Sequence, residues 1–97
     1  MDEGRYSLYR WTEPSINKYT DDHGFGSFDK DMEANKFDIA KYGEYVGSSD
    51  RFTDIIYMIS KYCGGIKHIG FRVKVWHNTK KIWTIEPDED DESFDDF

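Results

Sequence analysis

An amphipathic helix over residues 49–63 constrains this chain more than any other segment. Its apolar side chains recur at steps of three and four residues, which places them on one helix face: Phe52, Ile55, Ile56, Ile59 and Cys63. Ser48 or Ser49 can cap the first turn, and Gly64-Gly65 ends the helix. Because a helix with one apolar face must bury that face, the rest of the chain has to supply a surface that covers it.

The segments on either side of this helix predict strands. Apolar and polar residues alternate over residues 66–77, and residues 81–86 offer a partner strand, so we expect a β-hairpin that turns at residues 78–80. Residues 5–12 also alternate and predict a strand that ends before Pro14, since proline lacks the N–H that a sheet needs. The expected fold class is α+β, a small antiparallel sheet of three or four strands with one main amphipathic helix packed on it.

The middle of the chain has a weaker pattern. The glycines and polar residues of 20–27 are typical of a loop, and Gly24-Phe25-Gly26 is interpreted as a plain turn, because it lacks the third glycine of a phosphate-binding loop. Residues 29–35 are compatible with a short helix. Residues 37–46 fit neither period, and we favour a strand there.

Length and charge define one domain and a tail. A chain of 97 residues holds a single hydrophobic core, which we assign to residues 1–87. From residue 86 to the end there are eight acidic residues and no basic one. Like charge and little apolar surface cannot offset the entropy of ordering such a segment, so we expect residues 88–97 to form a disordered acidic tail.

The chain shows no motif for catalysis or metal binding. Its histidine and cysteine residues are His23, Cys63, His68 and His77, and their spacing matches no common zinc site. We therefore expect a protein that is not an enzyme and that needs no metal or cofactor. No apolar run reaches the roughly 20 residues that span a bilayer, so we expect a cytoplasmic protein without membrane contact.

Negative charge dominates the composition. The net charge is −7, with 20 acidic residues against 13 basic ones. Carboxylates on a folded protein can imitate the phosphates of a duplex, so we expect a basic host DNA-binding protein as the partner, and no direct binding to duplex DNA. The predicted partner-binding residues are Asp21, Asp22, Asp29, Asp31, Glu33, Asp38, Glu44, Asp50, Asp54, Asp88, Glu89, Asp90, Asp91, Glu92, Asp95 and Asp96. A homodimer is also compatible with the sequence.

The hairpin supports an alternative function. Its basic and aromatic side chains resemble a surface that binds single-stranded nucleic acid, with the acidic tail as an internal competitor that also recruits partners. The predicted nucleic-acid-binding residues are Arg72, Lys74, Trp76, Lys80 and Lys81. The opposing interpretation is an ordinary charged outer face, with Trp76 or Trp83 completing the core.

Two compositional resemblances follow from these residues. The acidic runs 88–92 and Asp21-Asp22, together with small size and abundant aromatic residues, resemble the host-takeover proteins that phages make early in infection. Several of those are DNA mimics that occupy a host nucleoid protein, polymerase or nuclease, which implies an inhibitor in the host cytoplasm. Residues 90–97 are similar to the acidic, Phe-terminated tails of single-stranded DNA-binding proteins, which favours the alternative function.

Overall fold

Four antiparallel strands form a single sheet in the computed structural model, which describes residues 4–62 and 72–88. The order across the sheet is β2-β1-β3-β4, so β1 and β3 are the central strands. Together with the helices this confirms the predicted α+β class. The strands are β1 (Tyr6–Arg10), β2 (Glu44–Ser49), β3 (Val73–His77) and β4 (Ile82–Thr84).

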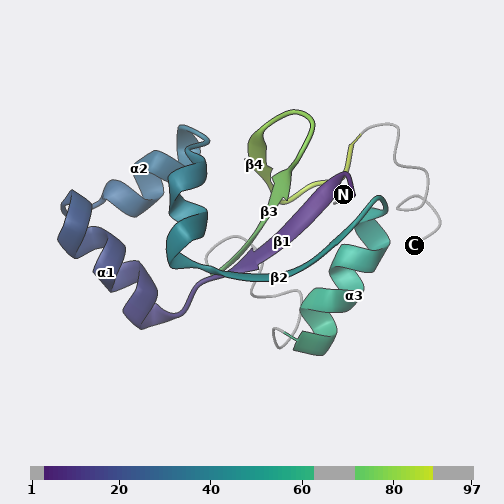
Figure 1. Ribbon diagram of the computed structural model, residues 1–97, viewed down its shortest axis with the longest axis horizontal. Helices are drawn as coiled ribbons and strands as arrows, with labels where there is room; N and C mark the ends of the chain where they lie inside the picture. The colour runs from purple at the N-terminus through teal and green to yellow at the C-terminus, as the bar shows by residue number, and fades with distance from the viewer. Residues whose placement is uncertain (1–3, 63–71, 89–97) are drawn as a thin grey trace.

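The helices form two groups. Figure 1 shows α1 and α2 towards one end of the long axis of the molecule and α3 on the other side of the sheet. A 3₁₀ helix, η1, joins α2 to the edge strand β2. The bounds are α1 (Glu13–His23), α2 (Ser27–Glu33), η1 (Phe37–Tyr42) and α3 (Phe52–Tyr62).

The predicted amphipathic helix is α3, and it packs on one face of the sheet. This core consists of Tyr6, Leu8, Phe52, Ile55, Ile56, Ile59, Val73 and Val75. The predicted cap Ser49 lies just before the helix: its hydroxyl oxygen accepts a hydrogen bond from the Arg51 N–H at 3.1 Å, and its hydroxyl donates to the first-turn residue Asp54 at 2.6 Å. Burial of each large apolar side chain stabilises such a core by about 1.5–3 kcal/mol. Cys63, the predicted last apolar residue of this face, lies outside the described residues.

A second, aromatic core covers the opposite face, where the sequence analysis expected no helix. Alternation along β1 and β3 turns Tyr9, Trp11 and Trp76 away from α3. Side chains of α1, α2 and η1 pack against them. This core consists of Trp11, Tyr19, Phe28, Met32, Ile39, Ala40, Trp76 and Trp83.

The loop predicted over residues 20–27 is wrong for its first half, which is the last turn of α1. A capping box starts this helix: the Thr12 hydroxyl accepts the Ser15 N–H at 3.2 Å, and the Ser15 hydroxyl accepts the Thr12 N–H at 2.9 Å. Pro14 stands in the first turn, where its missing N–H costs nothing. The pattern was missed because Ser15 replaces the usual Glu or Gln, and because few side chains of α1 are apolar.

The prediction for residues 37–46 was partly wrong, because η1 occupies most of the segment and β2 starts only at Glu44. Gly43 separates them, and a Cβ at this position would lie 2.7 Å from Trp11 Nε1, which is too close. The short helix expected at residues 29–35 is present as α2. The predicted hairpin is confirmed for β3 and β4, with Trp76 opposite Trp83; residues 66–71 lie outside the described ranges.

Trp11 joins the end of β1 to η1 through a buried hydrogen bond. This bond leads to a prediction about stability. Its indole N–H donates to the Ile39 carbonyl at 2.9 Å, whereas the Trp76 indole makes no hydrogen bond to the described residues. Trp11→Phe should therefore destabilise the protein by about 0.5–1.5 kcal/mol more than Trp76→Phe, because it removes a buried hydrogen bond and Trp76→Phe does not. Urea unfolding of both variants measures the difference, and equal losses would contradict this role of the hydrogen bond.

Candidate functional site

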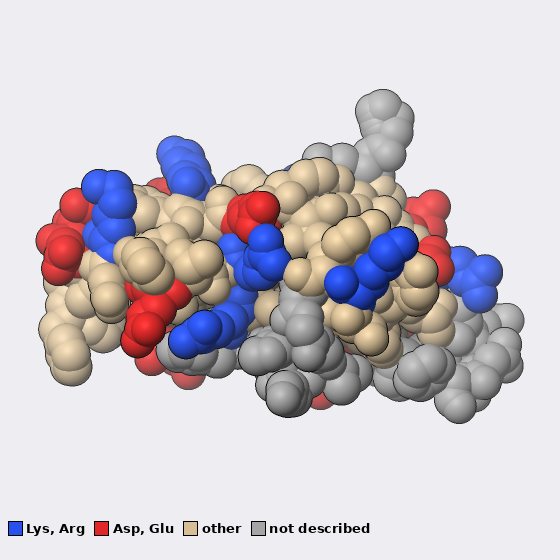
Figure 2. All heavy atoms as spheres, turned by 90° about the horizontal axis from the view of Figure 1, so that it is seen from below, with Lys and Arg blue, Asp and Glu red and all other residues tan. Residues whose placement is uncertain are grey.

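Most of the predicted acidic residues in the folded part take part in internal contacts. Figure 2 shows acidic side chains beside basic ones on the face it displays, not a continuous acidic surface. The internal contacts are those of Asp22 with Tyr42, Asp31 with Tyr19 and Lys36, Asp38 with Lys41, Glu44 with Arg10, Asp50 with the Arg5 N–H, and Asp54 with Ser49. These carboxylates stabilise the fold and present less charge to a partner than the sequence predicts.

Asp31 is the clearest example of a carboxylate used inside the fold. It accepts the hydroxyl hydrogen of Tyr19, and the Lys36 ammonium lies 3.7 Å away. Burial, followed by this hydrogen bond, raises the pKa of the Tyr19 phenol above its usual value. The same hydrogen bond lowers the pKa of Asp31, so the carboxylate stays charged and is balanced locally.

Asp22 is held in a similar way by the 3₁₀ helix. The Tyr42 hydroxyl donates to its carboxylate at 2.6 Å, and this hydrogen bond raises the pKa of the phenol. The contact joins the end of α1 to η1.

Asp88 belongs to the fold and not to the tail to which the sequence analysis assigned it. Its backbone N–H donates to the Tyr6 hydroxyl at 2.9 Å, and its carboxylate accepts from His77 Nε2 at 2.8 Å and Lys80 Nζ at 2.9 Å. Arg5 lies 3.5 Å away. Only 13% of the Asp88 side chain is exposed. The predicted disorder of residues 89–97 falls outside the described residues.

The two ring nitrogens of His77 have different hydrogen-bond partners, which define its tautomer. His77 Nδ1 accepts the Lys80 backbone N–H at 3.0 Å, so the ring proton is on Nε2 and points to Asp88. Burial raises the pKa of Asp88, but the hydrogen bonds from His77 and Lys80 outweigh this effect and leave it below its usual value. The charged cluster thus fixes the end of the described chain to β1 and to the hairpin turn.

The predicted aromatic surface for nucleic acid is absent from the hairpin, because Trp76 is only 5% exposed. Its ring packs between Phe37 and Trp83, with centroid distances of 4.7 and 4.8 Å. Lys74 is partly buried, and this burial lowers its pKa. Lys80 binds Asp88, whereas Arg72 and Lys81 have exposed side chains. The opposing interpretation was an ordinary charged outer face with Trp76 or Trp83 completing the core. Its second part is confirmed, because both tryptophans are buried, whereas a hydrophobic core covers each face of the sheet.

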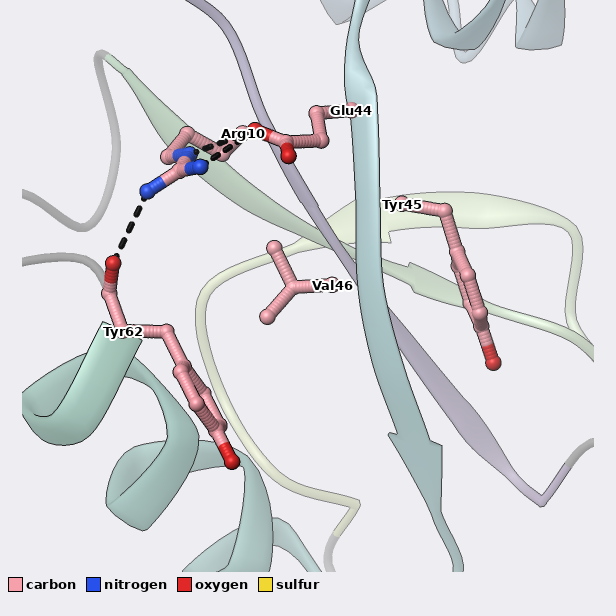
Figure 3. Close-up of a pocket in the computed structure, with 5 residues that line it drawn as sticks. All are labelled: Arg10, Glu44, Tyr45, Val46 and Tyr62. Carbon is pink, nitrogen blue, oxygen red and sulfur yellow. Dashed lines mark hydrogen bonds and ion pairs between the residues drawn. The ribbon is translucent and has the colours of Figure 1, made fainter.

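A polar hollow of about 240 Å³ lies where α3 ends against β1 and β2. Figure 3 shows the Arg10 guanidinium between Glu44 and the Tyr62 carbonyl, which it reaches at 2.8 Å. The Arg10 Nε also donates to Glu44 at 3.0 Å. Since Arg10 neutralises Glu44 and caps the last turn of α3, the hollow is explained by stability and not by ligand binding.

The remaining carboxylates of the predicted set in the described chain are Asp21 and Asp29, beside the corner between α1 and α2, and Glu33, at the opposite end of α2. All are exposed, and none forms a hydrogen bond or ion pair with another described residue. The corner also presents Phe25, which is 102% exposed. Phe25 is absent from the predicted site residues, although an aromatic residue between two glycines in a polar segment is a detectable signal. We define Asp21, Phe25 and Asp29 as the α1–α2 corner surface.

The described residues give no sign of a metal centre or a membrane span. Within ranges 4–62 and 72–88, no group of three His, Cys, Asp or Glu side chains could hold a metal ion. None of the helices in this part of the chain has the length and apolarity to cross a bilayer. No protein-family model matches the chain, and no curated protein or solved structure is significantly similar to it. Fold and surface therefore define a small α+β protein with an exposed acidic corner.

The Asp88 cluster predicts a pH-dependent stability. At neutral pH, Asp88→Asn should destabilise the protein by about 1–3 kcal/mol, because His77 and Lys80 lose a charged acceptor. The folded-state pKa of Asp88 lies below its ordinary value of 3.8, so its contribution is complete above that value and is lost as the pH falls through the folded-state pKa. The free energies of unfolding of the two proteins, measured with urea, should therefore approach each other as the pH falls below 3.8.

A matched control is Glu86→Gln, which removes an exposed carboxylate that contacts no other described residue. Its effect should be small at either pH. The role of the Asp88 carboxylate would be contradicted if the difference in free energy of unfolding between Asp88→Asn and the wild type stayed constant from neutral to acidic pH.

Proposed function

We propose that this protein is a non-enzymatic inhibitor that occupies the DNA-binding surface of a basic host protein by mimicking DNA. The observation that supports this most directly is the α1–α2 corner surface, where Asp21 and Asp29 project into solvent without a hydrogen bond or ion pair to another described residue. A nucleoid-associated protein, a polymerase or a nuclease of the host presents the basic groove that such a surface fits. The site of action is then the host cytoplasm, as for the phage proteins that the composition resembles.

A mimic needs charges on a rigid frame, and the two helices of the corner provide one. Tyr19 of α1 and Phe28 and Met32 of α2 are all buried in the aromatic core. The carboxylates on the outer faces of these helices are therefore held at fixed positions. Fixed charges lose less entropy on binding than the charges of a flexible polyanion.

The C-terminal residues add charge to the same function. Residues 89–97 hold six acidic side chains and no basic one. Because long-range attraction between such a segment and a basic groove is screened by salt, the association rate should fall as ionic strength rises.

The alternative function, binding of single-stranded nucleic acid, has weaker support. It depends on an exposed aromatic platform, and Trp76 is buried between Phe37 and Trp83. No second candidate function is therefore proposed.

The proposal predicts loss of DNA displacement when the corner is neutralised. Purified nucleoid-associated protein, polymerase and nuclease are each loaded with a labelled duplex, and the wild-type protein should displace DNA from at least one of them at low salt. The double variant Asp21→Asn/Asp29→Asn should do so about five- to tenfold less well, because each lost charge weakens attraction to the basic groove.

The matched control is Glu13→Gln/Glu86→Gln, which changes the net charge by the same amount at exposed positions outside the corner. It should retain most of the displacement. Equal losses for both variants would show that total charge matters and the corner does not. Failure of the wild type to displace DNA from any of the proteins would refute the proposed function.

A further inference from the structure

Phe25 stands alone in solvent at the corner between α1 and α2. Its exposure of 102% is as large as in an extended chain, and it exceeds that of every other large apolar side chain in the described ranges. Phe28 and Phe52 are buried, and Phe37 packs against Trp76. No aromatic or cation–π contact of the Phe25 ring is present among the described residues. Folding therefore gains nothing from the ring.

The backbone holds this ring outward on a fixed base. The Gly24 N–H donates to the Thr20 carbonyl at 2.7 Å, and the Lys30 N–H donates to the Gly26 carbonyl at 3.2 Å, so both glycines belong to helix ends. Gly24 and Gly26 have φ of 108° and 80°, values that other residues rarely adopt. The corner is thus a constrained turn with an aromatic side chain at its tip.

A hollow of about 320 Å³ lies beside the ring. Ile16 and Phe28 give it an apolar wall, and Asp29 gives it a carboxylate. These groups fit an Arg or Lys side chain, whose methylene stem packs on apolar atoms while its charged end meets a carboxylate and the face of an aromatic ring. Asp21 adds negative charge in the last turn of the neighbouring helix.

We infer that the α1–α2 corner is the anchor of the partner interface: Phe25 inserts into an apolar pocket of a basic protein surface, and an Arg or Lys side chain of that surface occupies the hollow beside Asp29. This inference rests on the proposed function, because it specifies the partner surface that the acidic protein binds. Interfaces concentrate their binding energy in such aromatic anchors within a polar rim. The partner pocket is apolar at its centre and basic at its edge.

The test uses two synthetic peptides of equal positive charge, one with leucines between the basic residues and one with serines in their place. The protein carries fluorine-labelled phenylalanine, and binding is followed by the fluorine resonance of Phe25. The leucine peptide should shift this resonance and should bind the wild type about tenfold more tightly than Phe25→Ser, since only the wild type supplies the anchor. The serine peptide should bind both proteins equally.

Two further variants complete the design. Tyr57→Ser removes an aromatic ring that is 62% exposed on α3, away from the corner, and it should bind the leucine peptide like the wild type. Asp29→Asn should weaken binding of both peptides. Because Phe25 contacts no core residue, Phe25→Ser should keep the urea midpoint of the wild type, so a folding defect cannot explain its loss of affinity.

The results separate this inference from the proposed function. Equal affinity of the leucine peptide for the wild type and Phe25→Ser, or no shift of the Phe25 resonance by either peptide, would overturn the anchor. Neither peptide experiment contains a DNA-binding protein, so a failure to displace DNA refutes the mimic and leaves the peptide result standing. Displacement of DNA that is unaffected by Phe25→Ser would also overturn the anchor while the mimic stands.

Discussion

The alternation of side chains along β1 is the constraint on which the rest of the structure depends. Tyr6 and Leu8 point to the core between the sheet and α3. Tyr9 and Trp11 point to the aromatic core between the sheet and α1, α2 and η1. A shift of one residue in the pairing of this strand would exchange the two sets, and the cores differ too much in shape to accept them. The central position of β1 therefore fixes where both helical groups dock.

The sequence predicts those elements whose apolar pattern is strong and local. The α3 helix and the β3–β4 hairpin were predicted because their periodicities are complete within one segment. The α1 helix was not, because most of its surface is polar and its apolar contacts, chiefly Tyr19, depend on distant residues. The internal contacts of the acidic residues were not predicted for the same reason. Asp22 pairs with Tyr42, 20 positions away, and Glu44 pairs with Arg10, 34 positions away, and no local pattern predicts contacts at such separations.

Internal pairing changes what net charge means for this protein. Carboxylates that accept hydrogen bonds from Tyr19, Tyr42 or His77 keep their charge, but the oxygens engaged in these bonds are less available for direct pairing with a partner's cation. The net charge of −7 therefore does not mean that the surface is uniformly acidic. The carboxylates that remain available for direct pairing include Asp21 and Asp29 of the α1–α2 corner surface, and residues 89–97 add six acidic side chains to the sequence.

The two components of the corner act over different ranges. Carboxylate attraction extends over about one Debye length, roughly 8–10 Å in physiological salt, so it accelerates encounter with any basic surface but selects weakly among them. An apolar ring such as Phe25 acts only in contact, and it slows dissociation from those surfaces that have a pocket of the right shape. Asp21 lies in the last turn of α1, where the helix dipole disfavours a carboxylate. Under the proposed function, a partner that supplies positive charge at this position removes the penalty, which is an interaction that the fold itself does not provide.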